Sequence, residues 1–280
     1  MIKNRIKKLK RLIEINNLDG YVIPKNDAYF SEYSSPDRLK ILTNFSGSAG
    51  FAIILKKENY LFVDGRYTIQ ANIQSGKYFK IMEVPKYSTK HILKKTKNKL
   101  SLGFDPQLFT NLSLKRKFAK NFNLLPITEN LIDKIYKDKS KKTISSFYNL
   151  DNKISGETTS SKIKRLIKIM KSKNIDNIFI SAAENVAWLL NIRGKDNPHS
   201  PIPNCKIILT NKKKIFFFSC PKKINKIKRN TDFKKITFCT YQDFLKILNK
   251  LRGNNFGVDS STCSVFNEKL IRTLFNITVS

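Results

Sequence analysis

The stretch that decides the fold is LTNFSGSAGFAIILKKENYLFVDGRYTIQA, residues 42–71. Two short apolar, β-prone runs, Ala52–Leu55 and Tyr60–Val63, flank a polar turn of the length found in β-hairpins. The second run ends at Asp64, a residue type that commonly caps helices, so we expect a helix to begin directly after it. Arg66 would then lie in the first helical turn after a buried strand, where α/β domains place groups that meet a ligand.

Arg66 supports two interpretations from the residues alone. In one, its guanidinium forms an ion pair with a nearby carboxylate, either Asp64 or Asp105. In the other, its position at the end of a strand lets it meet a ligand. The residue pattern by itself leaves both interpretations open.

The segment before the hairpin is rich in glycine and carries Gly47, Ser48 and Gly50. It precedes a strand and not a helix N-terminus, which argues against a phosphate-binding loop. Ser48 lacks the Gly-x-Ser-x-Gly spacing of a hydrolase nucleophile. We therefore expect a tight turn with close backbone approach.

Helices and strands alternate around this stretch. Apolar residues recur at helical spacing over residues 3–17, and proline ends the apolar run Gly20–Pro24. A short helix with Leu39, Ile41 and Leu42 as candidates for burial follows a polar loop. Further strands are expected near residues 78–84, 102–104 and 123–125, and further helices near residues 88–99 and 112–121. The alternation predicts an α/β domain with a mixed sheet.

The second half of the chain repeats the first in abbreviated form. Lys10–Ile13 returns as Lys164–Ile167, Tyr21–Ile23 as Ile178–Ile180, Leu42–Gly47 as Leu189–Gly194, and the hairpin as Lys206–Leu209 with Ile215–Phe218. Four matches in the same order indicate two copies of one α/β unit.

Apolar residues thin out in the middle of the chain, where Lys, Ser, Thr, Asp and Asn dominate. We therefore expect a first domain over residues 1–140, a linker over residues 141–160 and a second domain over residues 161–280. Trp188 lies in an apolar run of the second copy and is expected in the core.

Length and composition limit the class of protein. With 280 residues, 40% of them hydrophobic, the chain can form two domains that each have a core. No apolar run approaches the roughly 20 residues that cross a bilayer, and the basic N-terminus lacks an apolar signal region, so we expect a cytoplasmic protein with no membrane partner. The cysteines lack C-x-x-C spacing, which favours buried thiols over a disulfide pair or a metal site at Cys205, Cys220, Cys239 and Cys263.

Positive charge is spread along the whole chain. A net charge of +33 and a pI near 10.0 would ordinarily suggest nucleic acid or an anionic membrane as a partner. The lysine clusters at residues 94–95, 137–142 and 222–228 are separate, however, and no aromatic residues interleave with them for base stacking. We expect a solvated basic surface with no specific nucleic-acid partner, and only weak non-specific binding at low salt.

Residues suited to metal or acid–base chemistry are scarce. His91 and His199 are the only histidines, and neither has a partner at the spacing of metal ligands. His91 is interpreted as a solvated helix residue and His199 as a loop residue. We expect neither a metal site nor a cofactor within this chain.

Several motifs stand in order along the whole chain: Pro24–Tyr33, Phe45–Gly50, Asp64–Tyr67, Gly103–Pro106, Glu129–Ile135, Ser155–Glu157 and Ala187–Gly194 with Asp196. Together they resemble the N-terminal region of the Xaa-Pro aminopeptidases, also called aminopeptidase P, in their long three-domain form. The resemblance implies two tandem creatinase N-terminal-like domains, each a mixed sheet flanked by helices.

The resemblance also implies a larger enzyme. The family continues into a pita-bread catalytic domain, where two Asp, one His and two Glu bind two metal ions, usually manganese, that activate the attacking water. The present chain ends shortly after Gly257–Ser260, which resembles the closing strand of the second domain, so we expect the catalytic domain to be absent. No residue of this chain is assigned as catalytic or as a metal ligand.

For the N-terminal domains, the resemblance implies that they cover the active-site mouth, admit short proline-containing peptides and aid assembly into homo-oligomers. Arg66 matches the arginine of the family's Asp-Gly-Arg-Tyr motif, which reaches the bound peptide. The resemblance therefore implies a substrate-binding role for Arg66.

We accordingly expect the non-catalytic, two-domain portion of an Xaa-Pro aminopeptidase-like metallopeptidase, inactive on its own. The parent reaction would remove an N-terminal residue that precedes proline. Two alternatives remain, a free-standing binding module of the same fold without activity and a basic nucleic-acid-binding protein.

Overall fold

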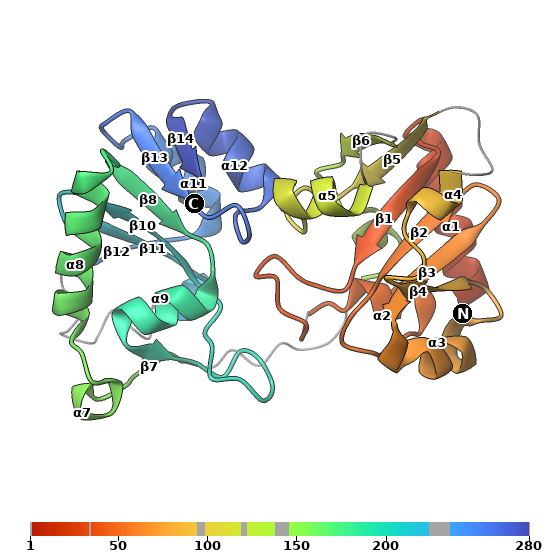
Figure 1. The fold of residues 1–280 in the computed structure, drawn as a ribbon, viewed down its shortest axis with the longest axis horizontal. Coiled ribbons are helices and arrows are strands. Elements are labelled where there is room, and N and C mark those ends of the chain that lie inside the picture. The colour runs from red at the N-terminus through yellow and green to blue at the C-terminus, as the bar shows by residue number, and fades with distance from the viewer. Residues whose placement is uncertain are drawn as a thin grey trace. The chain divides into compact units, whose positions relative to one another are not determined.

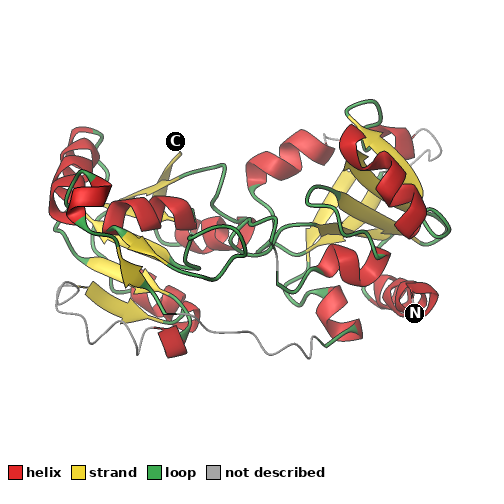
Figure 2. Cartoon of the chain, turned by 90° about the horizontal axis from the view of Figure 1, so that it is seen from below, coloured by secondary structure: helices red, strands yellow, loops and turns green. Residues whose placement is uncertain are grey.

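The computed structural model describes residues 2–33, 35–93, 99–118, 122–137, 146–223 and 236–279. Its contacts divide the chain into two compact units, unit 1 (residues 1–140) and unit 2 (residues 141–280). Figure 1 shows that each unit is built on a sheet with helices packed against it, and Figure 2 separates the helices from the strands by colour. The predicted fold class, two α/β units in tandem, is confirmed.

The sheet of unit 1 is centred on β1, which has one antiparallel and one parallel neighbour. The strand order is β4-β3-β2-β1-β5-β6, with β2 antiparallel to both of its neighbours and the remaining pairs parallel. The predicted hairpin is confirmed, because β2 and β3 pair with Phe51 opposite Phe62. The strands are β1 Gly20–Pro24, β2 Phe51–Leu55, β3 Asn59–Asp64, β4 Lys80–Val84, β5 Leu100–Phe104 and β6 Phe122–Pro126.

Helices cover both faces of this sheet because successive strand side chains point to opposite faces. On one face, α1 buries Leu9 and Ile13 beside Tyr21 of β1, and α2 and α6 pack against the same cluster. On the other face the rings of Phe51 and Phe118 meet edge to face. The helices are α1 Ile2–Ile15, α2 Arg38–Thr43, the 3₁₀ turn η1 Gly65–Tyr67, α3 Thr68–Ser75, α4 Lys90–Leu93, α5 Asn111–Phe118 and α6 Leu131–Ile135.

Unit 2 repeats the topology of unit 1. Its strand order is β12-β11-β10-β8-β13-β14, and the directions of neighbouring strands match those of unit 1 pair by pair. The register is also the same, since Tyr21 pairs with Gly103 in unit 1 and Ile178 pairs with Gly257 in unit 2. The predicted duplication is therefore confirmed. The strands are β8 Asn177–Ile180, β10 Lys206–Thr210, β11 Ile215–Phe218, β12 Ile236–Cys239, β13 Asn255–Val258 and β14 Asn276–Val279.

The helices of unit 2 also lie on both faces of the sheet. On one face, α8 and α9 bury Ile167 and Val186, and on the other α11 and α12 bury Phe244 and Ile271. The elements are α8 Thr159–Ser172, α9 Ala183–Leu190, the 3₁₀ turn η3 Tyr241–Asp243, α11 Phe244–Leu248 and α12 Val265–Arg272.

The prediction that Trp188 lies in the core is wrong, because its side chain is 51% exposed. The apolar residues around it in α9 turn inward and leave Trp188 at the edge of the helix; they are Val186, Ala187, Leu189 and Leu190. Two cations lie against the indole, Lys162 Nζ at 4.5 Å and Arg165 Cζ at 5.8 Å from the ring centroid. Such cation–π contacts hold an aromatic ring at a surface without burying it.

Part of the predicted linker forms ordered elements. Residues 141–145 lie outside the described part, as do most of the lysine clusters and the end of the helix predicted at residues 88–99. After them, β7 Tyr148–Asn149 pairs with β9 Ile192–Arg193, and α7 Asn152–Ser155 precedes α8. The assignment of residues 141–160 to a linker stays a prediction.

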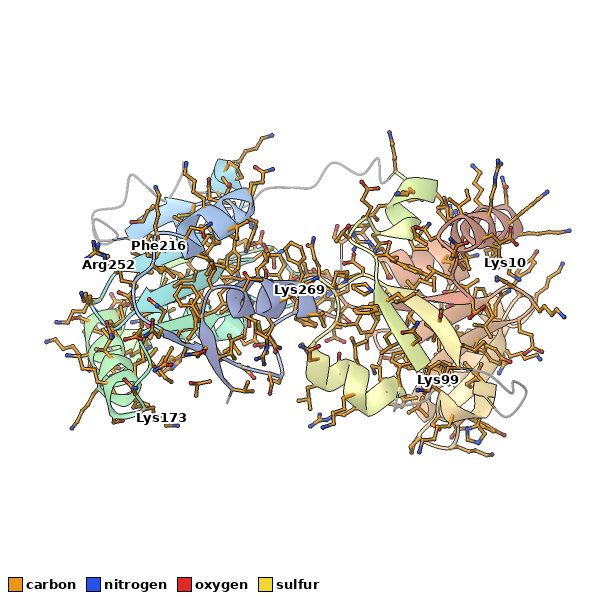
Figure 3. All side chains as sticks on the ribbon, turned by 90° about the horizontal axis from the view of Figure 1, so that it is seen from above. Lys10, Lys99, Lys173, Phe216, Arg252 and Lys269 are labelled. Carbon is orange, nitrogen blue, oxygen red and sulfur yellow. The ribbon has the colours of Figure 1, made fainter. Side chains whose placement is uncertain are left out.

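The described surface is rich in basic side chains, and the sulfur atoms lie mostly inside. Figure 3 shows nitrogen-tipped side chains that project outward, Lys10 and Lys173 among them. All four cysteines are free thiols; Cys205, Cys239 and Cys263 are buried as predicted, whereas Cys220 is only half-buried. Within the described ranges, no helix has the length and apolar character that crossing a bilayer requires.

Candidate functional site

Arg66 lies at the edge of the unit 1 sheet where β1, β3 and β5 end. These strands run in the same direction, because β1 is parallel to β5 and antiparallel β2 separates it from β3. Asp64 ends β3, and η1, which contains Arg66, follows at once. The carboxyl ends of strands are where α/β sheets usually bind ligands. Arg66 thus has the position that the sequence predicted, while its role stays a prediction.

Asp64 caps η1 and holds the Arg66 side chain with both carboxylate oxygens. Oδ1 accepts hydrogen bonds from the Arg66 backbone N at 3.0 Å and from Nε at 3.1 Å, and Oδ2 accepts one from Nη2 at 2.7 Å. The Arg66 side chain nevertheless remains 75% exposed. The ion pair considered from the sequence therefore forms with Asp64, whereas Asp105 accepts a hydrogen bond from Asn130 at 2.8 Å.

The pairing shifts the pKa of both groups away from neutrality. Hydrogen bonds from the Arg66 side chain hold the pKa of Asp64 below its ordinary value of 3.8. The same bonding raises the pKa of Arg66, to which the negative charges of Asp64 and Glu32 also contribute. The ion pair engages Nε and Nη2, so a guanidinium with five N–H donors retains others for a ligand.

The glycine-rich segment packs directly against η1. Ser48 Oγ lies 2.9 Å from Tyr67 Oη, and the ring of Phe45 meets the Tyr67 ring at nearly a right angle with centroids 5.7 Å apart. A Cβ atom on Gly47 would lie 2.3 Å from Phe45 Cζ and 2.9 Å from Tyr67 Cδ1. The expected close approach is confirmed, and it fixes the residue that follows Arg66.

Two glutamines of α3, which no sequence motif singles out, complete this edge. Gln74 Oε1 accepts a hydrogen bond from the Ser46 backbone N at 2.9 Å, and Gln70 Nε2 donates one to Ser46 Oγ at 2.9 Å. Gln70 and Gln74 are four residues apart and therefore share a face of α3. That spacing, so soon after Arg66, is the signal from which they could have been found.

The donors of a metal centre are not gathered at this edge. In the part of the chain that the structure describes, no three His, Cys, Asp or Glu side chains are placed to hold a metal ion together. His91 lies on α4, where its Nδ1 accepts a hydrogen bond from the Ser88 backbone N at 3.1 Å. His199 lies in the loop between β9 and β10. The described residues therefore do not fit a two-metal site.

Comparison with known proteins adds independent information. Two family models, both described as the creatinase/prolidase N-terminal domain, match residues 5–135 and 138–277. The chain is similar to a probable Xaa-Pro aminopeptidase P of Laccaria bicolor, with 32% identity over 225 residues, which is 76% of this chain and 35% of that protein. It is also similar to aminopeptidase P1 of Lotus japonicus, with 31% identity over 223 residues, which is 75% of this chain and 33% of that protein. The chain thus spans about a third of the length of the curated relatives it matches.

A solved structure shares the fold of the whole chain. It is the X-prolyl aminopeptidase from Caenorhabditis elegans, described as a cytosolic enzyme with a di-nuclear active site. The likeness has a TM-score of 0.85 at 24% sequence identity and covers 100% of this chain and 50% of that chain.

Proposed function

This chain belongs to the creatinase/prolidase N-terminal domain family, and from that membership we propose that it is the non-catalytic, substrate-facing portion of an Xaa-Pro aminopeptidase. In this proposal the parent reaction removes an N-terminal residue that precedes proline. The chain covers the active-site mouth, contacts the peptide and aids assembly into a homo-oligomer. We place the assembly in the cytoplasm.

The observation that carries the proposal is the way in which unit 1 presents Arg66. The guanidinium is fixed by Asp64 and is still 75% exposed at the carboxyl edge of the sheet. A fixed and exposed guanidinium suits the carboxylate or a carbonyl of a short peptide, because its fork of donors matches either group.

The chemical step belongs to other polypeptide in this proposal. The two manganese or similar divalent ions would be bound by a C-terminal pita-bread domain, and the metal centre there would activate the attacking water. The present chain supplies no ligand to that centre. Its contribution is to bind and orient the peptide and to limit which peptides enter.

A hydrolysis assay tests the non-catalytic assignment. The purified 280-residue chain is incubated with manganese and a short peptide whose second residue is proline. We expect no release of the first residue. Release that a chelator abolishes would overturn the assignment, because it would place a working metal centre in this chain.

A binding titration tests the role of Arg66. The probe is the tripeptide Ala-Pro-Ala with a free carboxylate, followed by amide chemical shifts in NMR. We expect Arg66→Ala to weaken binding about tenfold or more, since a hydrogen bond to a charged group contributes about 1.5–3 kcal/mol. Arg66→Lys should be intermediate, because lysine keeps the charge and loses the fork.

The matched control is Arg272→Ala. Arg272 is also a surface arginine, 53% exposed, and its Nη2 lies 2.7 Å from Glu268 Oε1 in unit 2. We expect this variant to bind the tripeptide as the wild type does. Equal weakening by both variants would show general charge attraction and would contradict a specific role for Arg66.

The same titration separates this proposal from a free-standing binding module of the same fold. The substrate-facing role predicts that a tripeptide with proline second binds more tightly than one with alanine second. Equal affinity for the two, or affinity for neither, would favour the free-standing module.

A further inference from the structure

Unit 2 contains a groove on the face covered by α8 and α9. Its volume is about 340 Å³. The groove lies beside α9, where α8 and α9 meet the carboxyl ends of β8 and β13. Residues of three elements and of the loop after β13 line it, among them Leu166 of α8, Ile178 and Ile180 of β8, Asn185 and Trp188 of α9, and Asp259 of the loop.

The duplication assigns each lining position a counterpart in unit 1. Ile178 corresponds to Tyr21 because each pairs with the glycine of the neighbouring parallel strand. Both short helices after the first strand, α2 and α9, end at an asparagine in the left-handed conformation, which aligns them. On this alignment Trp188 corresponds to Ile41, Asn185 to Arg38, and Asp259 to Asp105.

In unit 1 the same place is filled by α6 and the residue before it. Asn130 Nδ2 donates to Asp105 Oδ2 at 2.8 Å. The Leu131 backbone N lies 3.5 Å from Tyr21 Oη, and Leu131 itself is completely buried. Arg38 Nη2 lies 2.7 Å from Asp133 Oδ2, which ties α6 to α2.

The groove in unit 2 has the apolar floor that such a helix would cover. Tyr21 and Ile23 are each only 1% exposed in the cluster that includes Leu131 and Ile132 of α6, whereas the corresponding Ile178 and Ile180 are half-buried. Trp188 is 51% exposed at the rim. The last described element of unit 2 is β14, the counterpart of the strand that precedes α6.

We propose that this groove binds a short amphipathic helix of α6-like chemistry, supplied by polypeptide outside residues 1–280. The proposal rests on the proposed function, because the catalytic polypeptide invoked there is the source of the helix. Two adjacent aliphatic residues of the helix cover Ile178 and Ile180. Its surface closes over the indole of Trp188.

The polar residues of the groove define the occupant further. Asp259 Oδ1 accepts a hydrogen bond from the Ser261 backbone N at 2.8 Å, as Asp105 Oδ1 does from the Gln107 backbone N at 2.9 Å. Asp105 Oδ2 accepts a hydrogen bond from the Asn130 amide, whereas Asp259 Oδ2 already accepts one from Thr262 Oγ1 at 2.9 Å, so the occupant needs no donor at the turn before its helix. Because Asn185 replaces Arg38, the occupant needs no carboxylate where α6 has Asp133.

The test uses α6 itself as the probe. Thr278 and Val279 of β14 occupy the register of Leu125 and Pro126 of β6, so a copy of residues 128–137, TENLIDKIYK, is appended directly after Ser280. The covalent link gives the segment a high effective concentration at the groove. In a matched control, the two appended residues copied from Leu131 and Ile132 are replaced by aspartate.

The measurement is the intrinsic fluorescence of Trp188, which is the only tryptophan of the chain. In the extended protein, but not in the control, we expect the emission of Trp188 to shift to shorter wavelength and its quenching by acrylamide to fall about twofold or more. The melting temperature should rise by about 3 °C or more, as expected for roughly 1 kcal/mol of added stability in a unit of this size. Equal emission, quenching and melting in the extended protein and its control would overturn the proposal.

The outcomes of this experiment and of the tripeptide titration distinguish failure of the groove assignment from failure of the proposed function. A covered Trp188 together with no tripeptide binding by unit 1 would overturn the substrate role and leave the groove assignment standing. An exposed Trp188 together with tripeptide binding that depends on Arg66 would overturn the groove assignment alone.

Discussion

Asn44 and Asn191 occupy the same position in the two copies of the fold, yet only Asn191 is built into a network. Both end a helix in the left-handed conformation, with φ of 67° and 51°. Asn44 is exposed. Asn191 is 5% exposed, accepts a hydrogen bond from Lys162 Nζ at 2.6 Å and donates one to the Glu157 backbone O at 2.8 Å.

The first prediction concerns replacement of these caps by glycine. Asn44→Gly should change the free energy of unfolding by less than about 0.5 kcal/mol, because glycine adopts the left-handed conformation readily. Asn191→Gly should cost about 1–3 kcal/mol, because it removes one of the two acceptors of the buried Lys162 ammonium, the other being the Trp188 backbone O. Urea unfolding of the two variants checks this. Equal losses would contradict the role of the network.

The second prediction uses the equivalent glycines Gly103 and Gly257. A Cβ atom on Gly103 would lie 2.5 Å from Leu18 Cδ1 and 3.0 Å from Tyr21 Cδ2, whereas one on Gly257 would come no closer than 3.3 Å to Ile175 and Ile178. Gly103→Ala should therefore cost about 1–3 kcal/mol by overpacking, and Gly257→Ala less than about 1 kcal/mol. Thermal unfolding of both variants measures the difference. Equal losses, or a larger loss for Gly257→Ala, would contradict the tighter packing around Gly103.

The third prediction concerns Asp64 as the residue that positions Arg66. Asp64→Asn removes one negative charge and weakens the pair of hydrogen bonds that the two carboxylate oxygens accept from the Arg66 guanidinium. We expect weaker binding of Ala-Pro-Ala, by about threefold to tenfold, with the effect of a later Arg66→Ala change correspondingly smaller. A double-mutant cycle measured by NMR titration checks the coupling. Fully additive effects would show that the two residues act independently.

The fourth prediction is a pH dependence at Asp105. Burial raises the pKa of this carboxyl above its ordinary value of 3.8. The folded state therefore binds the proton more tightly than the unfolded state, so stability falls as the pH rises from 3.8 through the folded pKa. Asp105→Asn removes this component. The stability of the variant relative to the wild type should rise from about pH 3 to about pH 7 in urea titrations, and parallel pH profiles would contradict it.

The fifth prediction concerns the net charge of +33. We expect the chain to bind duplex DNA at low salt with equal affinity for unrelated sequences. The affinity should fall by about a thousandfold or more between roughly 50 mM and 200 mM salt, because binding releases counterions from the phosphates. Fluorescence anisotropy with two unrelated duplexes measures both quantities. A preference for one duplex that persists at the higher salt would support the nucleic-acid-binding alternative.

The parts of the fold that the sequence predicted are those with a strong local signal. The hairpin around Lys56, the cap at Asp64 and the duplicated order of elements follow from apolar runs separated by polar turns. The location of Arg66 followed from the same signals, because a cap residue after a buried strand fixes where the next helix begins. The family motifs then suggested its role, which stays a prediction.

What the sequence did not predict depends on tertiary contacts. Trp188 lies in an apolar run, and no local rule shows that α9 turns its other apolar residues inward. The groove beside it was missed for the same reason, since it becomes evident only when Ile178 is compared with Tyr21 beneath α6. Gln70 and Gln74 are polar residues on a helix, and their bonds to Ser46 require the chain to fold back over 24 and 28 residues.

The two six-stranded sheets have a further consequence for how such a chain arises and changes. Every described strand of either sheet finds its hydrogen-bonded neighbours within its own half of the chain. Genetic recombination near codon 140 would therefore exchange a complete sheet with its helices, and no strand would lose its hydrogen-bonded neighbour. A gene segment that encodes one such unit can be duplicated, and the second unit can then acquire new surface residues while the first keeps its function.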